Sequence, residues 1–125
     1  MKPFLTFMSP NGFTILVGKN AKQNDDLSLR VARANDLWFH ADKAQGAHVV
    51  MQTQTNRPFA QSDITFAAEL AIIHSKAIKN KTVPVTVCEA AMVTKPKHFP
   101  DGAVLCEQTV TVYVNSHRSN THRTI

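Results

Sequence analysis

The sequence predicts one α+β domain: a mixed, mainly antiparallel sheet with one long packed helix and one short helix. The chain has 125 residues, 43% of them hydrophobic and 18% charged, which is enough for one domain with its own core. Short β-branched and aromatic runs alternate with turn-forming residues, and one longer segment has helical periodicity. We expect the domain to span residues 1–114 and residues 115–125 to form a polar tail.

The first two strands are expected at residues 4–8 and 13–17, which are rich in β-branched and aromatic residues. Residues 9–12, Ser-Pro-Asn-Gly, separate them. Proline fixes φ early in a turn and Asn-Gly tolerates positive φ, so we expect a four-residue hairpin loop that pairs Met8 with Phe13. Both faces of this hairpin are largely apolar, which predicts that both are covered.

A short helix is expected over residues 24–32. Asn20 or Asn24 is suited to cap it, and Asp25 and Asp26 would favour its positive N-terminal end.

The next two strands are expected at residues 36–41 and 47–52, joined by a five-residue link. Pairing Ala41 with Ala47 leaves one wholly apolar face, which we assign to the core. The other face then carries Trp38, His40 and His48.

The long helix is expected over residues 62–79, with Lys76 and Lys79 on a narrow polar strip. A strand at residues 83–88 follows, with Pro84 near its start. Residues 93–102 predict a rigid basic loop, and residues 103–106 and 109–114 predict a closing hairpin.

The charge distribution indicates attraction to polyanions. Lys and Arg number 14 against 9 Asp and Glu, a net charge of +5, with the positive charge in the blocks 19–33 and 76–97. Cys88 and Cys106 lie in apolar, β-branched surroundings that are typical of buried thiols, so we expect a reducing, cytoplasmic location. No segment is long and apolar enough for a membrane span, and no secretory signal is expected.

The sequence lacks the spacings that characterise catalysis. It has no Gly-x-Ser-x-Gly, no phosphate-binding glycine loop and no His-Glu-x-x-His, so we expect neither an enzyme nor a cofactor. His40 and His48 could together hold Zn²⁺ or Cu²⁺ if Asp36 or His74 supplied a third ligand. The alternatives are a structural hydrogen-bonded pair or imidazoles that contact a ligand.

The lysines also have two interpretations. Lys95-Pro96-Lys97 is either a solvated turn or a pair of phosphate contacts held in place by prolines, and the same holds for Lys76 and Lys79. Around residue 20, helix capping explains the Asn and Asp residues but not Lys19, Lys22 and Gln23.

An ordered series of motifs carries a family resemblance. The series is Gly18-Lys19-Asn20-x-x-Gln23-Asn24-Asp25-x-Leu27-Ser28-x-Arg30-x-Ala32, Asp36-Leu37-Trp38-Phe39-His40-Ala41, Gly46-Ala47-His48-Val49-Val50, Ala67-Ala68-x-Leu70-Ala71, Ser75-Lys76-Ala77, Val83-Pro84-Val85 and Lys95-Pro96-Lys97. Over residues 4–114 this resembles the NFACT-R domain, the RNA-binding module of NFACT proteins, which include the RqcH-type ribosome quality-control factors. Ala47 stands where many members carry Ser.

The resemblance implies binding of structured RNA, either tRNA or rRNA, with possible association with the large ribosomal subunit. The NFACT-N domain, helix-hairpin-helix and coiled coil of longer members are absent from this sequence, so tailing of nascent chains is not expected, and the sequence resembles the stand-alone NFACT-R proteins. DNA binding and docking on a ribosomal or nucleic-acid-processing protein assembly remain alternatives. The candidate contact residues are Lys19, Asn20, Lys22, Gln23, Asn24, Arg33, Asp36, Trp38, His40, His48, Ser75, Lys76, Lys79, Lys95 and Lys97.

Overall fold

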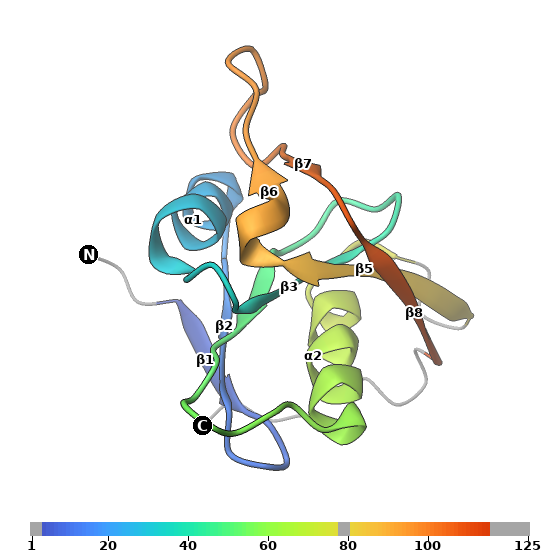
Figure 1. Ribbon diagram of the computed structural model, residues 1–125. Helices are drawn as coiled ribbons and strands as arrows, with labels where there is room; N and C mark the ends of the chain where they lie inside the picture. The colour runs from blue at the N-terminus through green and yellow to red at the C-terminus, as the bar shows by residue number, and fades with distance from the viewer. Residues whose placement is uncertain (1–3, 78–80, 116–125) are drawn as a thin grey trace.

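A computed structural model describes residues 4–77 and 81–115 (Figure 1). Its main sheet has six strands in the order β1-β2-β4-β3-β5-β8, and all pairings in it are antiparallel. These strands are β1 (Leu5–Met8), β2 (Thr14–Val17), β3 (Leu37–Ala41), β4 (Val49–Met51), β5 (Thr82–Glu89) and β8 (Val110–Asn115). The remaining elements are β6 (Val93–Thr94), β7 (Leu105–Cys106), α1 (Ala21–Asp26), η1 (Leu27–Val31), α2 (Gln61–Ile73) and η2 (Ala90–Met92). The α+β prediction is confirmed.

The sheet separates two hydrophobic clusters. Helix α2 packs on one face, where Phe39, Ile15 and Val85 are fully buried. On the other face, α1 and η1 cover the β1–β2 side of the sheet, and Leu27 packs against Trp38. Burial of both faces explains why the sheet carries apolar side chains on each side.

The first hairpin differs by one residue from the expected register. Met8 pairs with Thr14 rather than with Phe13. The Phe13 N–H donates to the Ser9 hydroxyl over 3.0 Å, and the Ser9 N–H donates to the Phe13 carbonyl over 2.9 Å. These bonds close the turn one residue later than predicted and turn Phe13 into the core, where it is 1% exposed. The prediction that both faces are covered is confirmed.

The short helix begins earlier than expected. Asn20 is its N-cap, and its side chain accepts the Gln23 N–H over 2.9 Å. Because α1 starts at Ala21, Asp25 and Asp26 lie in its last turn, so the prediction that they favour the helix N-terminus is wrong. The chain continues without a break into the π-helical turn η1.

The long helix ends at Ile73, six residues before the predicted end at 79. Backbone bonds to the β3–β4 loop stop it: the Ala47 N–H donates to the His74 carbonyl over 2.9 Å, and the Lys76 N–H donates to the Gln45 carbonyl over 2.7 Å. Lys76 therefore follows the helix instead of projecting from it. Lys79 lies outside the described residues.

The register expected for β3 and β4 is confirmed, since Trp38 pairs with Val50. The predicted strand at 83–88 is confirmed within β5. The predicted closing hairpin is wrong, because β7 pairs with β6 while β8 pairs with β5. Gln108, at a φ of 50°, lies in the segment where the chain leaves β7 for β8, and Val114 then completes the core beside α2. Asn115 ends β8, and residues 116–125 lie outside the described residues.

Candidate nucleic-acid interface

An open cavity of about 840 Å³ lies at the end of β3 that carries His40. Four segments that are distant in sequence line it: residues 18–24, 44–47, 74–76 and 100–103. Helix α1 contributes its first turn, the β3–β4 loop and the end of α2 contribute a second wall, and the β6–β7 connection contributes a third. The fold therefore joins several of the predicted contact residues around one hollow.

The polar motif at the start of α1 is mostly structural. Asn20 caps the helix, and the Gln23 side chain accepts the Lys19 N–H over 3.0 Å. Asn24 is buried, accepts the His48 N–H over 3.0 Å and donates to the Gly46 carbonyl over 3.4 Å. These amides fix the wall of the cavity, while the side chains of Lys19 and Lys22 are exposed.

Close backbone packing forms the floor of the cavity. Gly46 forms a β-bridge with Ser75, and a Cβ atom at position 46 would lie 2.5 Å from the Ser75 Cβ and 2.7 Å from its Cα. At Gly18, a Cβ atom would lie 2.1 Å from the Asn24 side-chain oxygen. Both sites therefore require glycine: a side chain at position 18 would separate α1 from the end of β2, and one at position 46 would separate the end of α2 from the β3–β4 loop.

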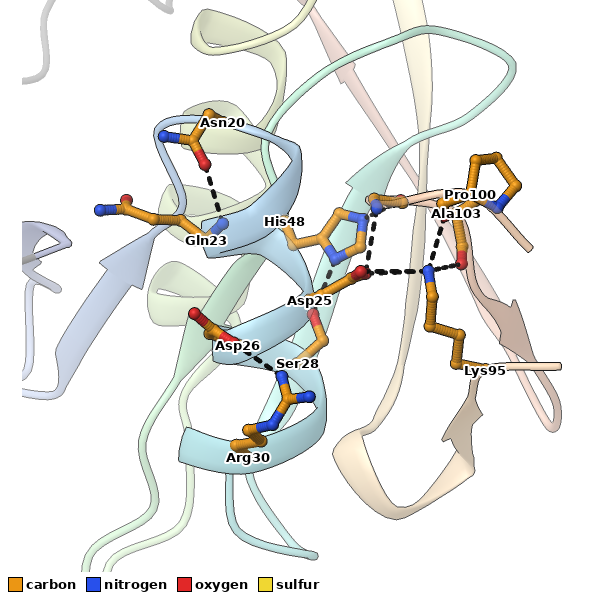
Figure 2. A network of polar contacts seen from close by, with 11 residues as sticks. Asn20, Gln23, Asp25, Asp26, Ser28, Arg30, His48, Lys95, Pro100 and Ala103 are labelled. Atoms are coloured by element: carbon orange, nitrogen blue, oxygen red, sulfur yellow. Dashed lines mark hydrogen bonds and ion pairs between the residues drawn. The ribbon is translucent and has the colours of Figure 1, made fainter. Parts of the chain in front are cut away.

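A partly buried ion pair anchors the β6–β7 connection (Figure 2). The Lys95 ammonium lies 3.1 Å from Asp25 Oδ2 and donates to the carbonyls of Pro100 and Ala103 over 2.6 and 2.9 Å. The Gly102 N–H donates to Asp25 Oδ1 over 3.1 Å. Lys95 therefore holds the wall of the cavity and has no open side for a phosphate, contrary to the expectation from sequence.

A chain of hydrogen bonds runs from the core to the same wall. Trp38 Nε1–H donates to the Ser28 hydroxyl over 2.8 Å, and Ser28 Oγ lies 2.7 Å from His48 Nδ1. His48 Nε2 lies 3.0 Å from the Gly102 carbonyl, which can only accept. The geometry therefore assigns the proton to Nε2, so that His48 is neutral, accepts from Ser28 and donates to Gly102.

Burial keeps His48 in that neutral state. Burial, followed by the charge of the neighbouring His40, lowers the pKa of His48 to about 4. Burial also lowers the pKa of His40. Trp38 and His48 are only 3% and 2% exposed, so neither ring is available to a nucleic acid in this fold, contrary to the sequence-based expectation.

The hydrogen bonds of His48 argue against the alternative that His40 and His48 bind a metal ion. Both of its ring nitrogens are engaged, so His48 has no free lone pair for a metal ion. Within residues 4–77 and 81–115, no three His, Cys, Asp or Glu side chains gather into a possible metal site. Cys88 is buried, and burial raises the pKa of its thiol to about 12, which leaves it protonated and unsuited to metal binding.

Comparison with known proteins identifies the domain. The model of the family described as "NFACT protein RNA binding domain" matches residues 3–108. This chain belongs to the NFACT-R family. Over that span, the resemblance predicted from the sequence motifs is confirmed.

Relatives of this NFACT-R domain are larger proteins. The chain is 39% identical over 109 residues to the Rqc2 homolog RqcH of Bacillus subtilis, covering 87% of this chain and 19% of that protein. It is 28% identical over 74 residues to the human ribosome quality control complex subunit NEMF, covering 59% of this chain and 7% of that protein. The chain thus spans about a fifth or less of the length of these relatives.

A solved structure shares the fold. It is the C-terminal part of the fibronectin/fibrinogen-binding protein of Streptococcus suis, with a TM-score of 0.87 and 32% sequence identity, covering 98% of this chain and 50% of that one. No helix in the described part of the NFACT-R domain has the length and apolar character needed to cross a membrane.

Apart from Lys79, which lies outside the described residues, the predicted contact residues fall into three groups in the NFACT-R domain. Those that line the cavity are Lys19, Asn20, Asn24, His40, Ser75 and Lys76. Those that serve the interior or the helix cap are Gln23, Asp36, Trp38, His48 and Lys95. Those exposed outside the cavity lining are Lys22, Arg33 and Lys97.

Asp36 and Arg33 belong to the opposite end of β3 from the cavity. Asp36 is 1% exposed, and its carboxylate accepts the Arg33 N–H and both the N–H and the hydroxyl of Thr53, each over 2.9 Å. Asp36 is therefore a structural acceptor, and the expectation that it contacts nucleic acid is not supported by its position.

The sequence reasoning missed the backbone part of the site. Gly46 and Gly102 line the cavity, as does the exposed Asp101. Gly46 belongs to the Gly46-Ala47-His48-Val49-Val50 motif, but only its contact with Ser75 shows why glycine is needed. Asp101 introduces one carboxylate beside the lysines, so the cavity is mixed in charge rather than uniformly basic.

Proposed function

We propose that this NFACT-R domain binds structured RNA, either tRNA or rRNA, along the rim of the cavity. One observation carries the proposal: the fold places the exposed Lys19 and Lys76 on two walls of a single hollow that also contains His40 and Ser75. A nucleic-acid backbone that crosses the hollow would meet an ammonium group on each wall.

The chemistry of these groups suits a sugar-phosphate chain. Lysine ammonium groups contact phosphates without regard to sequence. The exposed Asn20 uses only its side-chain oxygen to cap α1, so its amide N–H groups can donate to 2′-hydroxyl groups, which distinguish RNA from DNA. Because the walls are fixed by buried amides and by the Lys95–Asp25 pair, little ordering would be needed on binding.

The printed names of the relatives suggest the biological setting. RqcH is named as an Rqc2 homolog, and NEMF is named as a subunit of the ribosome quality control complex. We therefore propose that this domain acts in ribosome-associated quality control, where both tRNA and the rRNA of the large subunit would be present as ligands. The family's description as a binding domain agrees with a role without catalysis.

The test is charge reversal at the two walls. Lys19→Glu with Lys76→Glu should weaken binding of unmodified bulk tRNA about tenfold or more at moderate salt. It should also reduce the slope of log K against log salt by about two, because two phosphate contacts are lost. Fluorescence anisotropy with end-labelled tRNA across a salt series measures both quantities.

Arg33→Glu is the matched control. It reverses another exposed cation, but at the other end of β3, and it leaves the backbone bond to Asp36 intact. Lys76→Glu alone should weaken binding more than Arg33→Glu alone. Equal losses would mean that only net charge matters, and no tRNA affinity in the unaltered protein would contradict the proposed function itself.

A further inference from the structure

We infer that the interface continues from the cavity onto the outer part of the sheet, where Tyr113 stacks on an unpaired RNA base. This inference rests on the proposed function and adds the kind of RNA recognised, a segment that contains at least one unstacked nucleotide. The surface consists of Pro84 and Thr86 on β5 and Thr111 and Tyr113 on β8; we call it the open sheet face.

The strand registers place this face next to the cavity. His40 pairs with Thr86, and Thr86 pairs with Thr111. Pro84 pairs with Tyr113 in the same ladder. Paired residues share a side of the sheet, so these side chains lie on the side of His40, away from α2. Because His40 also lines the cavity, the open sheet face and the cavity form one continuous surface.

Tyr113 is the most prominent side chain on this face. It is 71% exposed and is the one aromatic ring among the exposed large hydrophobic residues of the described chain. Its neighbours Val112 and Val114 pack toward α2, so the alternation of β8 directs the ring outward. In Figure 1, α1 lies over the other part of the sheet, while β5 and β8 extend away from it.

The charges around the ring favour an anionic partner. Strand β8 carries no charged residue, and the single carboxylate of β5, Glu89, lies at the end that pairs with Leu37, away from Pro84. A second open cavity, of about 440 Å³, brings Lys43 and Lys76 beside Pro84, together with Asp42. Lys76 borders both cavities, so its ammonium could contact a phosphate shared by the two parts of the interface.

A base is the occupant that fits this combination. Single-stranded segments bind proteins by stacking bases on exposed aromatic rings while lysines contact the backbone. One isolated ring among small threonines offers such a platform for one base. A protein partner would instead be expected to use a broader apolar patch, whereas the open sheet face as defined here combines the ring with Pro84 and two threonines.

The test compares two RNA probes. A single-stranded 12-nucleotide RNA of mixed sequence and a blunt duplex of the same sequence are titrated against the protein and its variants. Tyr113→Thr keeps β-propensity but removes the ring, and it should weaken the single-stranded probe about fivefold or more while changing the duplex less than twofold. Tyr113→Phe should bind both probes as the unaltered protein does.

Val110→Ala is the matched control, because Val110 is 62% exposed on the same strand but has no ring; it should leave both affinities unchanged. If Lys76→Glu weakens binding and Tyr113→Thr does not, the inference is wrong and the proposed function stands. If the unaltered protein binds neither probe nor tRNA, the proposed function fails first. Loss of co-purifying ribosomal protein with unchanged RNA affinity would reassign the face to a protein partner.

Discussion

Replacing Lys95 with glutamate is expected to lower the free energy of unfolding by about 2–3 kcal/mol, less than the cost of breaking a fully buried ion pair, because Lys95 is partly exposed. In the unaltered protein, the Lys95 ammonium contacts Asp25 and the carbonyls of Pro100 and Ala103. The substitution places a carboxylate against these three negatively polarised groups. The Lys95 and Asp25 side chains are 22% and 10% exposed, so water screens part of the repulsion but not all of it. Urea denaturation followed by circular dichroism measures the loss.

Lys97→Glu provides the control in the same connection. Lys97 is exposed and lies two residues away, so the same charge change there should alter stability by no more than about 0.5 kcal/mol. Lys95→Met, which keeps the length of the side chain and removes the charge, should fall between the two. Equal stability of the Lys95→Glu and Lys97→Glu proteins would show that the ion pair does not hold the wall of the cavity.

Stability should also fall by about 3 kcal/mol as the pH is lowered from about 6.5 to about 4, through the titration of His48. Burial, followed by the charge of His40, lowers the pKa of His48 to about 4 from 6.5. Above pH 6.5 both states are neutral and the full stability is present. As the pH falls, the unfolded chain binds a proton that the folded domain does not, so unfolding becomes easier until the folded His48 itself protonates.

His48→Gln separates this titration from others. The variant should be less stable than the unaltered protein at pH 7, because it loses the ring that joins Ser28 to Gly102, but its stability should change less between pH 6.5 and 4. A smaller slope from His40 should remain, since its pKa is lowered in the same direction. Identical pH dependence of the two proteins would contradict the assignment.

The carboxyl group of Asp63 titrates at a lower pH than His48. Burial would raise its pKa, but hydrogen bonds from Ser9, Ala60 and Asn11 outweigh burial and lower the pKa below 3.8. Its contribution to stability is therefore present above that pH and is lost only as the pH falls further. Asp63 therefore does not contribute to the loss between pH 6.5 and 4 that is expected from His48.

The two hairpins show what the sequence could and could not predict about the fold. In β3 and β4 one face is uniformly apolar, and this alternation was sufficient to predict that Trp38 pairs with Val50. In β1 and β2 both faces are apolar, so hydrophobicity could not choose between neighbouring registers. The bonds between Ser9 and Phe13 decide the register, and these depend on the detailed geometry of the turn.

The sequence motifs predicted several residues of the candidate site, but not the contacts that these residues make with distant parts of the chain. The motifs marked Lys19, Asn20, Ser75 and Lys76, which the fold brings to one cavity. Lys95 was misinterpreted because Asp25, 70 positions away, is adjacent only in three dimensions. Tyr113 was overlooked, although its place between Val112 and Val114 was a signal that its ring points away from the core.

The most direct test of the central claim is to map the RNA-binding surface by NMR. The ¹⁵N-labelled protein is titrated with unmodified bulk tRNA, and amide chemical shifts are followed. If tRNA binds across the cavity, the largest changes occur at residues 18–20, 44–47, 75–76 and 100–103, which surround it. Changes concentrated instead at residues 53–63, around the start of α2, or absent everywhere at saturating tRNA, would contradict binding across the cavity.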